Sequence, residues 1–241
     1  LSSFCQWPDA PQGAQVIWCG NPNNPTGQVI PKKELVEYIQ KHPEQVFVFD
    51  QSYASFSPQE VLRAREAISL GNVILVQSLT KSFAIPGLRL GYLVSNATTL
   101  EGIRALSHPW SVNTLAIEAG KWLLRNQALY EGIEAQLLKS SRTLRAKLSS
   151  FPWLSIVPTD THFFIFYFEV SGATSADLKE WLARERGILV RDATNMGALG
   201  SACIRVASQG EEADQALVDA LRDWYQQQSS QQPYHSSSSP Q

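Results

Sequence analysis

The stretch SLTKSFAIPGLRLGY, residues 78–92, places two cations among side chains that are mostly apolar or hydroxylic. Lys81 comes first, and Arg89 follows it between two leucines. Neither has an acidic neighbour within the stretch, although a lone lysine is normally a solvated surface residue. The segment therefore raises the question of which partners these two cations have, and the answer must come from the rest of the chain.

Short apolar runs alternate with helical patterns on both sides of this stretch. The spacing of apolar side chains predicts helices at residues 31–42 and 57–70. Runs rich in β-branched and aromatic residues predict strands at residues 14–19, 45–49, 72–77 and 90–94. Strands that alternate with helices in this way predict an α/β fold with a mainly parallel sheet.

The pattern changes near Pro109 and becomes typical of a smaller α+β domain. A long helical pattern, interrupted around Asn126, covers residues 114–150. It is followed by predicted helices at 175–187 and 211–228 and predicted strands at 154–157, 163–168, 187–191 and 202–207. We therefore expect three parts: residues 1–112 from a large domain, a small C-terminal domain with its linking long helix at 113–228, and a disordered low-complexity tail at 229–241.

The composition excludes several classes of function. The net charge of −2 and the isoelectric point near 6.1 show no excess of basic residues of the kind that binds nucleic acid. No apolar stretch reaches membrane-spanning length without charge, so we expect no membrane partner. Cys5, Cys19 and Cys203 are far apart and odd in number, which favours a reducing compartment and predicts a cytoplasmic protein. No metal site is predicted, because no metal-ligand spacing links the four histidines, His42, His108, His162 and His235.

Polar side chains follow three of the predicted strands, at the point where each strand ends. They form NPNNPTG at residues 21–27, DQSY at 50–53 and SLTK at 78–81, and Arg89 follows. Ligands of α/β proteins bind at the carboxyl ends of the strands, so we expect these groups to share one site. Taken singly, each has an ordinary interpretation: a turn for NPxxG, a helix cap or ion pair for Asp50, and half-buried packing for Tyr53.

Pyridoxal phosphate chemistry requires all of these parts together. The cofactor needs a lysine for its aldehyde and a carboxylate beside its pyridine nitrogen. It also needs hydrogen-bond donors at its ring oxygen, and a cation with hydroxyls at its phosphate. The side chains that match these roles in turn are Lys81, Asp50, Tyr53 with Asn24, and Ser78 with Arg89.

In the order NPNNPTG, D-x-x-Y, S-x-x-K and R, the chain resembles the fold-type I pyridoxal phosphate enzymes, the class I/II aminotransferase superfamily. The resemblance implies an aminotransferase-like α/β fold in which residues 1–112 belong to the large cofactor-binding domain. It makes Lys81 the Schiff-base lysine and pairs Asp50 with the pyridine nitrogen, and it counts both with Tyr53 as catalytic. Asn24 and Tyr53 would contact the ring oxygen. Ser78 and Arg89 would contact the phosphate and so answer the opening question.

Within this superfamily the chain is most similar to the L-threonine O-3-phosphate decarboxylases, which make aminopropanol phosphate for cobalamin biosynthesis. The similarity lies in residues 78–94, 109–113 and 187–207. Histidinol-phosphate aminotransferases are close neighbours and imply a transaminase as the alternative. In either case Arg191 would hold the substrate phosphate, and Arg205 would hold the amino acid carboxylate of the decarboxylase substrate. The alternative role for either arginine is an ion pair with a surface acid such as Asp192.

The chain departs from the superfamily before Leu1. Members have an N-terminal part with a glycine-rich phosphate-binding turn and contacts across a homodimer, and this sequence shows no counterpart. We therefore expect a fragment of a longer polypeptide, homodimeric when intact and possessing little activity alone. A non-catalytic remnant of such an enzyme is the further alternative. His162 stands near a position where relatives often have Asn, and its role stays open.

Overall fold

The computed structural model describes residues 15–196 and 200–231. Among these, the residues up to Lys139 together with Pro158–His162 form one compact unit, and Ser140–Val157 with the residues from Phe163 onward form a second. The boundary expected between residues 112 and 113 differs from this division. Cys5, His235 and most of the expected tail lie outside the described residues, and residues 229–231 form the end of helix α8 (Glu211–Gln231).

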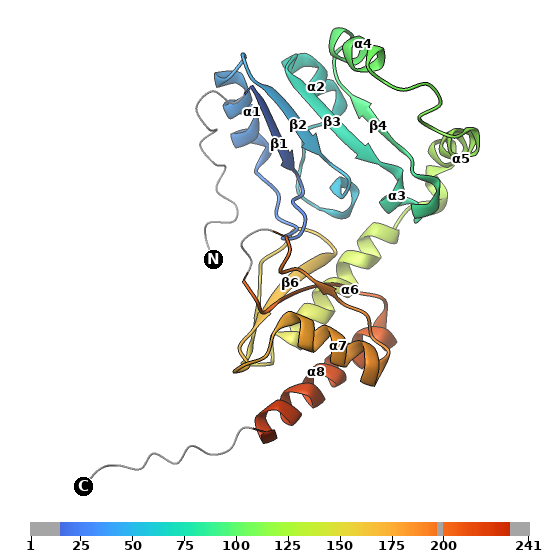
Figure 1. The fold of residues 1–241 in the computed structure, drawn as a ribbon. Coiled ribbons are helices and arrows are strands. Elements are labelled where there is room, and N and C mark those ends of the chain that lie inside the picture. The colour runs from blue at the N-terminus through green and yellow to red at the C-terminus, as the bar shows by residue number, and fades with distance from the viewer. Residues whose placement is uncertain (1–14, 197–199, 232–241) are drawn as a thin grey trace. The chain divides into compact units, whose positions relative to one another are not determined.

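The first unit contains a four-stranded sheet (Figure 1). Its strands lie in the order β1 (Val16–Gly20), β2 (Val46–Asp50), β3 (Val73–Ser78) and β4 (Gly91–Val94). The first three are parallel, and β4 runs antiparallel to β3. The predicted α/β fold with a mainly parallel sheet is confirmed.

Helix α1 (Lys32–Lys41) packs one apolar side against this sheet. Leu35 and Ile39, one turn apart, are both buried in a cluster with Phe47 and Phe49 of β2. Pro31 precedes the first turn, where a missing N–H costs nothing. The helix therefore follows its sequence pattern closely.

Helix α2 (Ala64–Leu70) is shorter than the predicted helix at 57–70. The prediction is wrong for residues 57–63 because tertiary contacts hold that segment in another conformation. The carbonyl of Leu62 accepts a hydrogen bond from Gln51 Nε2 at 3.0 Å. The helix begins only after Arg63, whose N–H donates to Glu66 Oε2 at 2.8 Å.

Short helices and turns complete the first unit. Helix α3 (Leu79–Ser82) follows β3 directly, and η2 (Ala54–Phe56) and η3 (Pro86–Leu88) are single 3₁₀ turns. Helix α4 (Ala97–Ala105) was not predicted, although Asn96 caps it by accepting from Thr99 N–H at 2.9 Å. Helix α5 (Thr114–Arg125) ends at Asn126, where the sequence predicts an interruption, and η4 (Gln127–Tyr130) leads into α6 (Ile133–Leu148).

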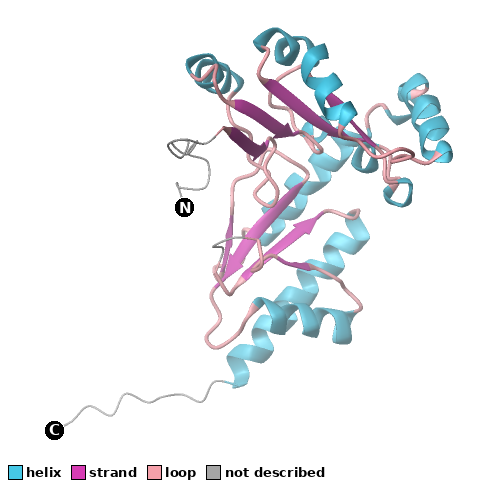
Figure 2. Cartoon of the chain, turned by 45° about the horizontal axis from the view of Figure 1, so that its top comes forward, coloured by secondary structure: helices cyan, strands magenta, loops and turns pink. Residues whose placement is uncertain are grey.

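The second unit is an antiparallel sheet with helices; Figure 2 draws strands in magenta and helices in cyan. Its strand order is β5 (Leu154–Ile156), β6 (Phe163–Phe168), β8 (Cys203–Ala207) and β7 (Arg191–Asp192). Helices α7 (Ser175–Arg186) and α8 (Glu211–Gln231) share its main core with the sheet and with the end of α6.

The predicted strand at 187–191 is wrong except at its last residue. Gly187 adopts a left-handed conformation with φ of +65° and ends α7. The N–H of Ile188 then donates to the Leu182 carbonyl at 3.0 Å. These helix-ending contacts occupy the backbone that a longer strand would need. Among the described residues, no helix has both the length and the apolar character needed to cross a membrane.

Candidate functional site

The ends of β1 and β2 lie level in the first unit, and β3 runs on from Val76, the partner of Asp50, to Ser78. Gly20 pairs with Asp50, and Asp50 pairs with Val76. The register continues into the loops, because Asn21 N–H donates to the Asp50 carbonyl and Gln51 N–H to the Val76 carbonyl, both at 2.9 Å. Parallel strands that end level place their following loops at one edge of the sheet, as the sequence predicts.

A cavity of about 310 Å³ opens at this edge. Four of the predicted site residues line it: Asn24, Asp50, Tyr53 and Lys81. The other lining residues are Trp18, Gly20, Pro22, Asn23 and Ser52. The structure therefore brings together a carboxylate, a phenol, a carboxamide and an amine that come from three separate segments of the chain.

The loop after β1 is held in shape by its own hydrogen bonds. Asn23 N–H donates to the Gln28 carbonyl at 2.8 Å, and Gly27 N–H donates to the Asn23 carbonyl at 2.7 Å. The Asn23 side chain donates to Thr26 Oγ1 at 2.8 Å. Gly27 has a φ of +73°, which is comfortable only for a residue without Cβ. The turn presents Asn24 at the cavity wall.

The Asp50 carboxylate is oriented by Ser52. Both the N–H and the hydroxyl of Ser52 donate to Asp50 Oδ1, at 2.9 and 2.6 Å. Among the described residues, Oδ2 receives no hydrogen bond, so the second oxygen can accept from a ligand. The sequence motif predicts a role for Asp50 but none for Ser52.

Lys81 lies in α3 with its Nζ 5.6 Å from the centroid of the Tyr53 ring. None of the ion pairs between described residues involves Lys81 or Arg89. The two cations of the opening stretch thus have no acidic partner in the described part of the chain.

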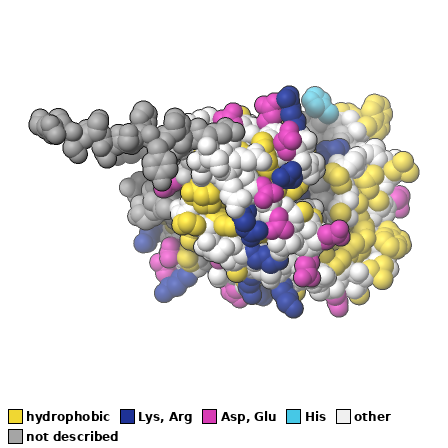
Figure 3. All heavy atoms as spheres, turned by 90° about the horizontal axis from the view of Figure 1, so that it is seen from below, with side chains coloured by type: hydrophobic (Ala, Val, Ile, Leu, Met, Phe, Trp, Pro, Cys, Tyr) yellow, Lys and Arg dark blue, Asp and Glu magenta, His cyan; other side chains and the backbone are white. Residues whose placement is uncertain are grey.

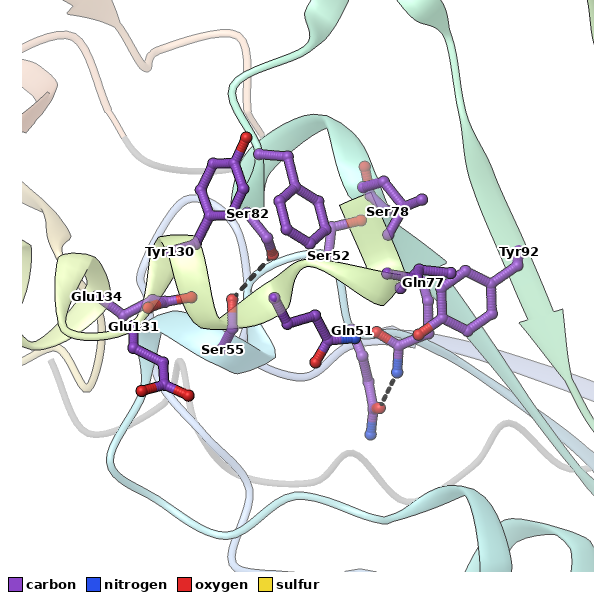
Figure 4. Close-up of a pocket in the computed structure, with 14 residues that line it drawn as sticks. Gln51, Ser52, Ser55, Gln77, Ser78, Ser82, Tyr92, Tyr130, Glu131 and Glu134 are labelled. Carbon is purple, nitrogen blue, oxygen red and sulfur yellow. Dashed lines mark hydrogen bonds between the residues drawn. The ribbon is translucent and has the colours of Figure 1, made fainter. Parts of the chain in front are cut away.

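A second cavity, of about 340 Å³, is drawn in Figure 4. It shares Ser52 with the first and so adjoins it. Ser78 lines this second cavity and not the first. Figure 4 shows the hydroxyls of Ser55 and Ser82 facing each other, with 3.0 Å between their oxygens. Hydroxyl groups therefore line the cavity next to the one that contains Lys81.

Arg89 lines neither cavity. It has a φ of +53° at the end of η3, and its Nη1 donates to the Pro86 carbonyl at 3.0 Å. Of the six predicted cofactor residues, the structure thus places four in one cavity, Ser78 in the adjoining one, and Arg89 outside both.

Sequence reasoning assigned no role to the segment Pro158–His162, which belongs to the first unit. Asp160 Oδ2 accepts from Val29 N–H at 3.0 Å, close after the NPNNPTG loop. The His162 ring lies 4.3 Å from the Phe56 ring and 6.1 Å from the Tyr53 ring, centroid to centroid. No local sequence signal marks these contacts, because their partners are more than a hundred residues away.

In the second unit, Arg191 and Arg205 are direct cross-strand partners in the β7–β8 ladder. Both line a cavity of about 440 Å³. The Arg205 guanidinium lies 5.0 Å from the centroid of the Phe163 ring, and Arg191 Nη2 donates to Asn195 Oδ1 at 3.4 Å. The suggested alternative partner, Asp192, instead accepts from Thr194 through Oδ1.

Two like charges directly opposite each other on neighbouring strands repel, so this pair is a favourable place for an anion. Burial raises the pKa of the neighbouring Cys203 thiol to about 11, which keeps it neutral.

Comparisons with known proteins point to one family. The family model described as aminotransferase class I and II matches residues 6–221. A histidinol-phosphate aminotransferase of Thermoanaerobacter sp. (strain X514) is 30% identical over 92% of this chain and 60% of its own length. A threonine-phosphate decarboxylase of Salmonella typhimurium is 31% identical over 84% of this chain and 55% of its own length.

Among solved structures, the L-threonine-O-3-phosphate decarboxylase from Porphyromonas gingivalis matches with a TM-score of 0.83 and 32% identity. The match covers 88% of this chain and 65% of that one. The chain thus spans about 60% of the length of the curated relatives that it matches first. The family match covers most of the sequence, and the predicted motifs meet at one cavity. The chain belongs to the aminotransferase class I and II family.

Proposed function

We propose that the cavity at the ends of β1, β2 and β3 binds pyridoxal 5'-phosphate, and that the chain is part of an enzyme that uses it. One observation carries the proposal: Asn24, Asp50, Tyr53 and Lys81 line the same cavity although three segments supply them. This donor set fits the ring of the cofactor, with an amine for the aldehyde, a carboxylate for the pyridine nitrogen and two donors for the ring oxygen.

Bound in this cavity, pyridoxal phosphate would supply an electron sink for a reaction at the α-carbon of an amino acid. Asp50 would hold the proton on the pyridine nitrogen through Oδ2, while Ser52 keeps the carboxylate in place through Oδ1. Asn24 and Tyr53 would donate hydrogen bonds to the ring oxygen. Ser78, in the adjoining cavity, and Arg89 would hold the phosphate.

Lys81 has two tasks in this proposal. Its amine would bind the aldehyde before the substrate arrives, and once released it would carry a proton to or from the substrate α-carbon. The absence of an acidic partner within the described residues leaves the amine available for both tasks. Lys81, Asp50 and Tyr53 are therefore the proposed catalytic residues.

The proposed substrate is a phosphorylated amino acid or amine. Arg191 would hold its phosphate and Arg205 its carboxylate. The cross-strand pairing of the two arginines in one cavity supports this assignment, because an anion bound there relieves their repulsion.

We propose decarboxylation of L-threonine O-3-phosphate to aminopropanol phosphate, a step of cobalamin biosynthesis, as the specific reaction. The similarity to a solved decarboxylase of that substrate, at 32% identity, supports it. The alternative is transamination of histidinol phosphate, which the 30% identity to a histidinol-phosphate aminotransferase over 92% of this chain supports equally well. The two reactions differ in which α-carbon bond breaks, and both use the same proposed residues.

We also propose that the enzyme is a cytoplasmic homodimer. Large apolar side chains lie exposed along α5 and just before it, and Figure 3 shows hydrophobic side chains gathered on the side where Figure 1 places α5. Exposed apolar surface of this kind is typical of protein–protein interfaces. The exposed residues are Trp110, Val112, Leu115, Ile117, Trp122 and Leu124. The buried Cys203 forms no disulfide with any described residue, which supports a reducing compartment.

The test uses the full-length gene product reconstituted with pyridoxal phosphate. One assay follows carbon dioxide release from L-threonine O-3-phosphate. A parallel assay follows conversion of 2-oxoglutarate to glutamate with histidinol phosphate as the amino donor. Carbon dioxide without glutamate establishes the decarboxylase, and glutamate without carbon dioxide establishes the aminotransferase. Cofactor binding with neither product would overturn both reactions, and no cofactor binding would leave the chain as a non-catalytic remnant.

A further inference from the structure

We propose that Asp160 is a positioning residue of the cofactor site and fixes the loop that carries Asn24. The inference rests on the proposed binding of pyridoxal phosphate. It adds a residue that does not line the cavity and that lies 131 positions from its main partner in the sequence.

Asp160 makes three hydrogen bonds to other described residues of the first unit. Its Oδ2 accepts from Val29 N–H at 3.0 Å, and its Oδ1 accepts from Gln59 Nε2 at 3.1 Å. Its own N–H donates to the Gly27 carbonyl at 3.0 Å. Two of the three bonds therefore fall on the backbone of Gly27 and Val29, where the chain leaves the NPNNPTG loop. Hydrogen bonds from a backbone N–H to a carboxylate are among the stronger ones in proteins.

These bonds reach Asn24 through the loop itself. Gly27 N–H donates to the Asn23 carbonyl, and Asn23 N–H donates to the carbonyl of Gln28, which stands between the two residues held by Asp160. The position of Asn23 therefore depends on residues 27–29, which Asp160 holds in place. Asn24 follows Asn23 directly in the chain. A shift of Gly27 and Val29 would move the Asn24 carboxamide relative to the cavity.

The same short segment also reaches the second proposed donor to the ring oxygen. His162 packs on Phe56 with 4.3 Å between ring centroids, and Phe56 lies in the 3₁₀ turn that Tyr53 precedes. Asp160 and His162 thus contact the two stretches that carry Asn24 and Tyr53. This arrangement is what a segment that positions both donors requires.

The chemistry of these bonds predicts which substitutions are tolerated. Asp160→Asn keeps a carbonyl oxygen for Val29 N–H, and its amide can donate to Gln59 once the Gln59 side chain has turned over. Asp160→Ala removes both acceptors and leaves the Val29 N–H without its partner. Gln59→Ala removes only the bond at Oδ1 and serves as the matched control.

The readout is the pH at which the visible absorption band of the Lys81-bound cofactor changes in the full-length protein. Hydrogen bonds donated to the ring oxygen stabilise its anionic form. Without the bond from Asn24, the proton that this oxygen shares with the Lys81 nitrogen would be held more tightly, and its pKa would rise. We expect the midpoint to rise by about 0.5–1 pH unit in Asp160→Ala, the equivalent of one hydrogen bond. Asp160→Asn and Gln59→Ala should stay near the wild-type value. None of the three variants replaces another titratable residue of the site: Asp50, Tyr53 and His162 are present in all of them.

A purely structural role would lower the melting temperature of Asp160→Ala without moving this midpoint, and that result would overturn the proposal. Should Asp160→Ala fail to fold, Asp160→Glu gives the same test, because its longer side chain displaces the carboxylate from Val29. An unmoved midpoint in Asp160→Glu would overturn the proposal as well. A wild-type protein without a visible band would instead overturn the proposed function, and the role of Asp160 with it.

Discussion

Replacing Gly91 by alanine would separate β3 from β4 beside the proposed site. Gly91 pairs with Ser78, and a Cβ at position 91 would lie 2.6 Å from the carbonyl oxygen of Gln77. That oxygen belongs to the backbone, so no side chain can rotate away to make room. The strands would have to move apart by about 0.8 Å to restore ordinary van der Waals contact.

The expected loss of stability follows from two opposing effects. Overpacking of this kind costs about 1–3 kcal/mol in the folded state. Replacing glycine by alanine also restricts the unfolded chain, which returns about 0.4–1 kcal/mol. We therefore expect Gly91→Ala to lower the free energy of unfolding by about 1–2 kcal/mol. Since Ser78 and the start of α3 lie at the displaced strand end, pyridoxal phosphate should also bind more weakly.

The assay is urea unfolding followed by circular dichroism, together with absorbance titration of the cofactor. Gly102→Ala is the matched control, because Gly102 lies exposed in α4. Outside the adjoining helix backbone, no described atom lies within 4 Å of an added Cβ. In a helix interior this substitution should raise stability by about 0.5–1 kcal/mol. If Gly91→Ala proved as stable as Gly102→Ala and bound the cofactor with wild-type affinity, the reasoning would be refuted.

Three further predictions concern the second unit. Arg205→Ala should weaken substrate binding by about thirtyfold, the equivalent of about 2 kcal/mol for a charge-assisted hydrogen-bonded pair, while cofactor affinity changes little. Arg184→Ala, which removes an exposed ion pair with Glu180, should change neither, and an equal loss of both affinities in Arg205→Ala would make Arg205 structural. Cys203 is fully buried and its pKa is raised to about 11. Thiol reagents at pH 8 should therefore label it only after unfolding. Labelling in the folded protein would contradict the burial of this side chain. The same shift predicts that stability falls as the pH rises from 9 toward about 11, because only the unfolded thiol ionises in that range.

The elements that the sequence predicts well are those whose pattern is local. The strand at 163–168 has the predicted bounds, because a run of aromatic and apolar residues suffices to define it. The prediction of a helix at 57–70 is wrong for its first half. There Gln51 and Asp160 form hydrogen bonds to a segment whose own sequence pattern is helical. The prediction of a strand at 187–191 is wrong because the contacts that end α7 at the left-handed Gly187 occupy the start of this segment.

The candidate site divides in the same way. The NPNNPTG, DQSY and SLTK motifs each follow a strand, so a rule about strand ends was enough to predict that Asn24, Asp50 and Lys81 meet. The opposition of Arg191 and Arg205 depends on the register of two strands, which their spacing along the chain does not determine. The contacts of Asp160 join distant parts of the chain and leave no local pattern in the sequence.

The most direct test of the central claim is chemical capture of the cofactor on Lys81. The full-length protein is incubated with pyridoxal phosphate and treated with borohydride, which reduces an imine between a lysine and the aldehyde to a stable amine. The protein is then digested, and the masses of its peptides are measured by mass spectrometry. We expect one phosphopyridoxyl group on the peptide that contains Lys81. We expect no such label in Lys81→Ala and an unchanged label in Lys33→Ala, because the Lys33 side chain is 89% exposed. A label spread over exposed lysines, or one that survives in Lys81→Ala, would contradict the account.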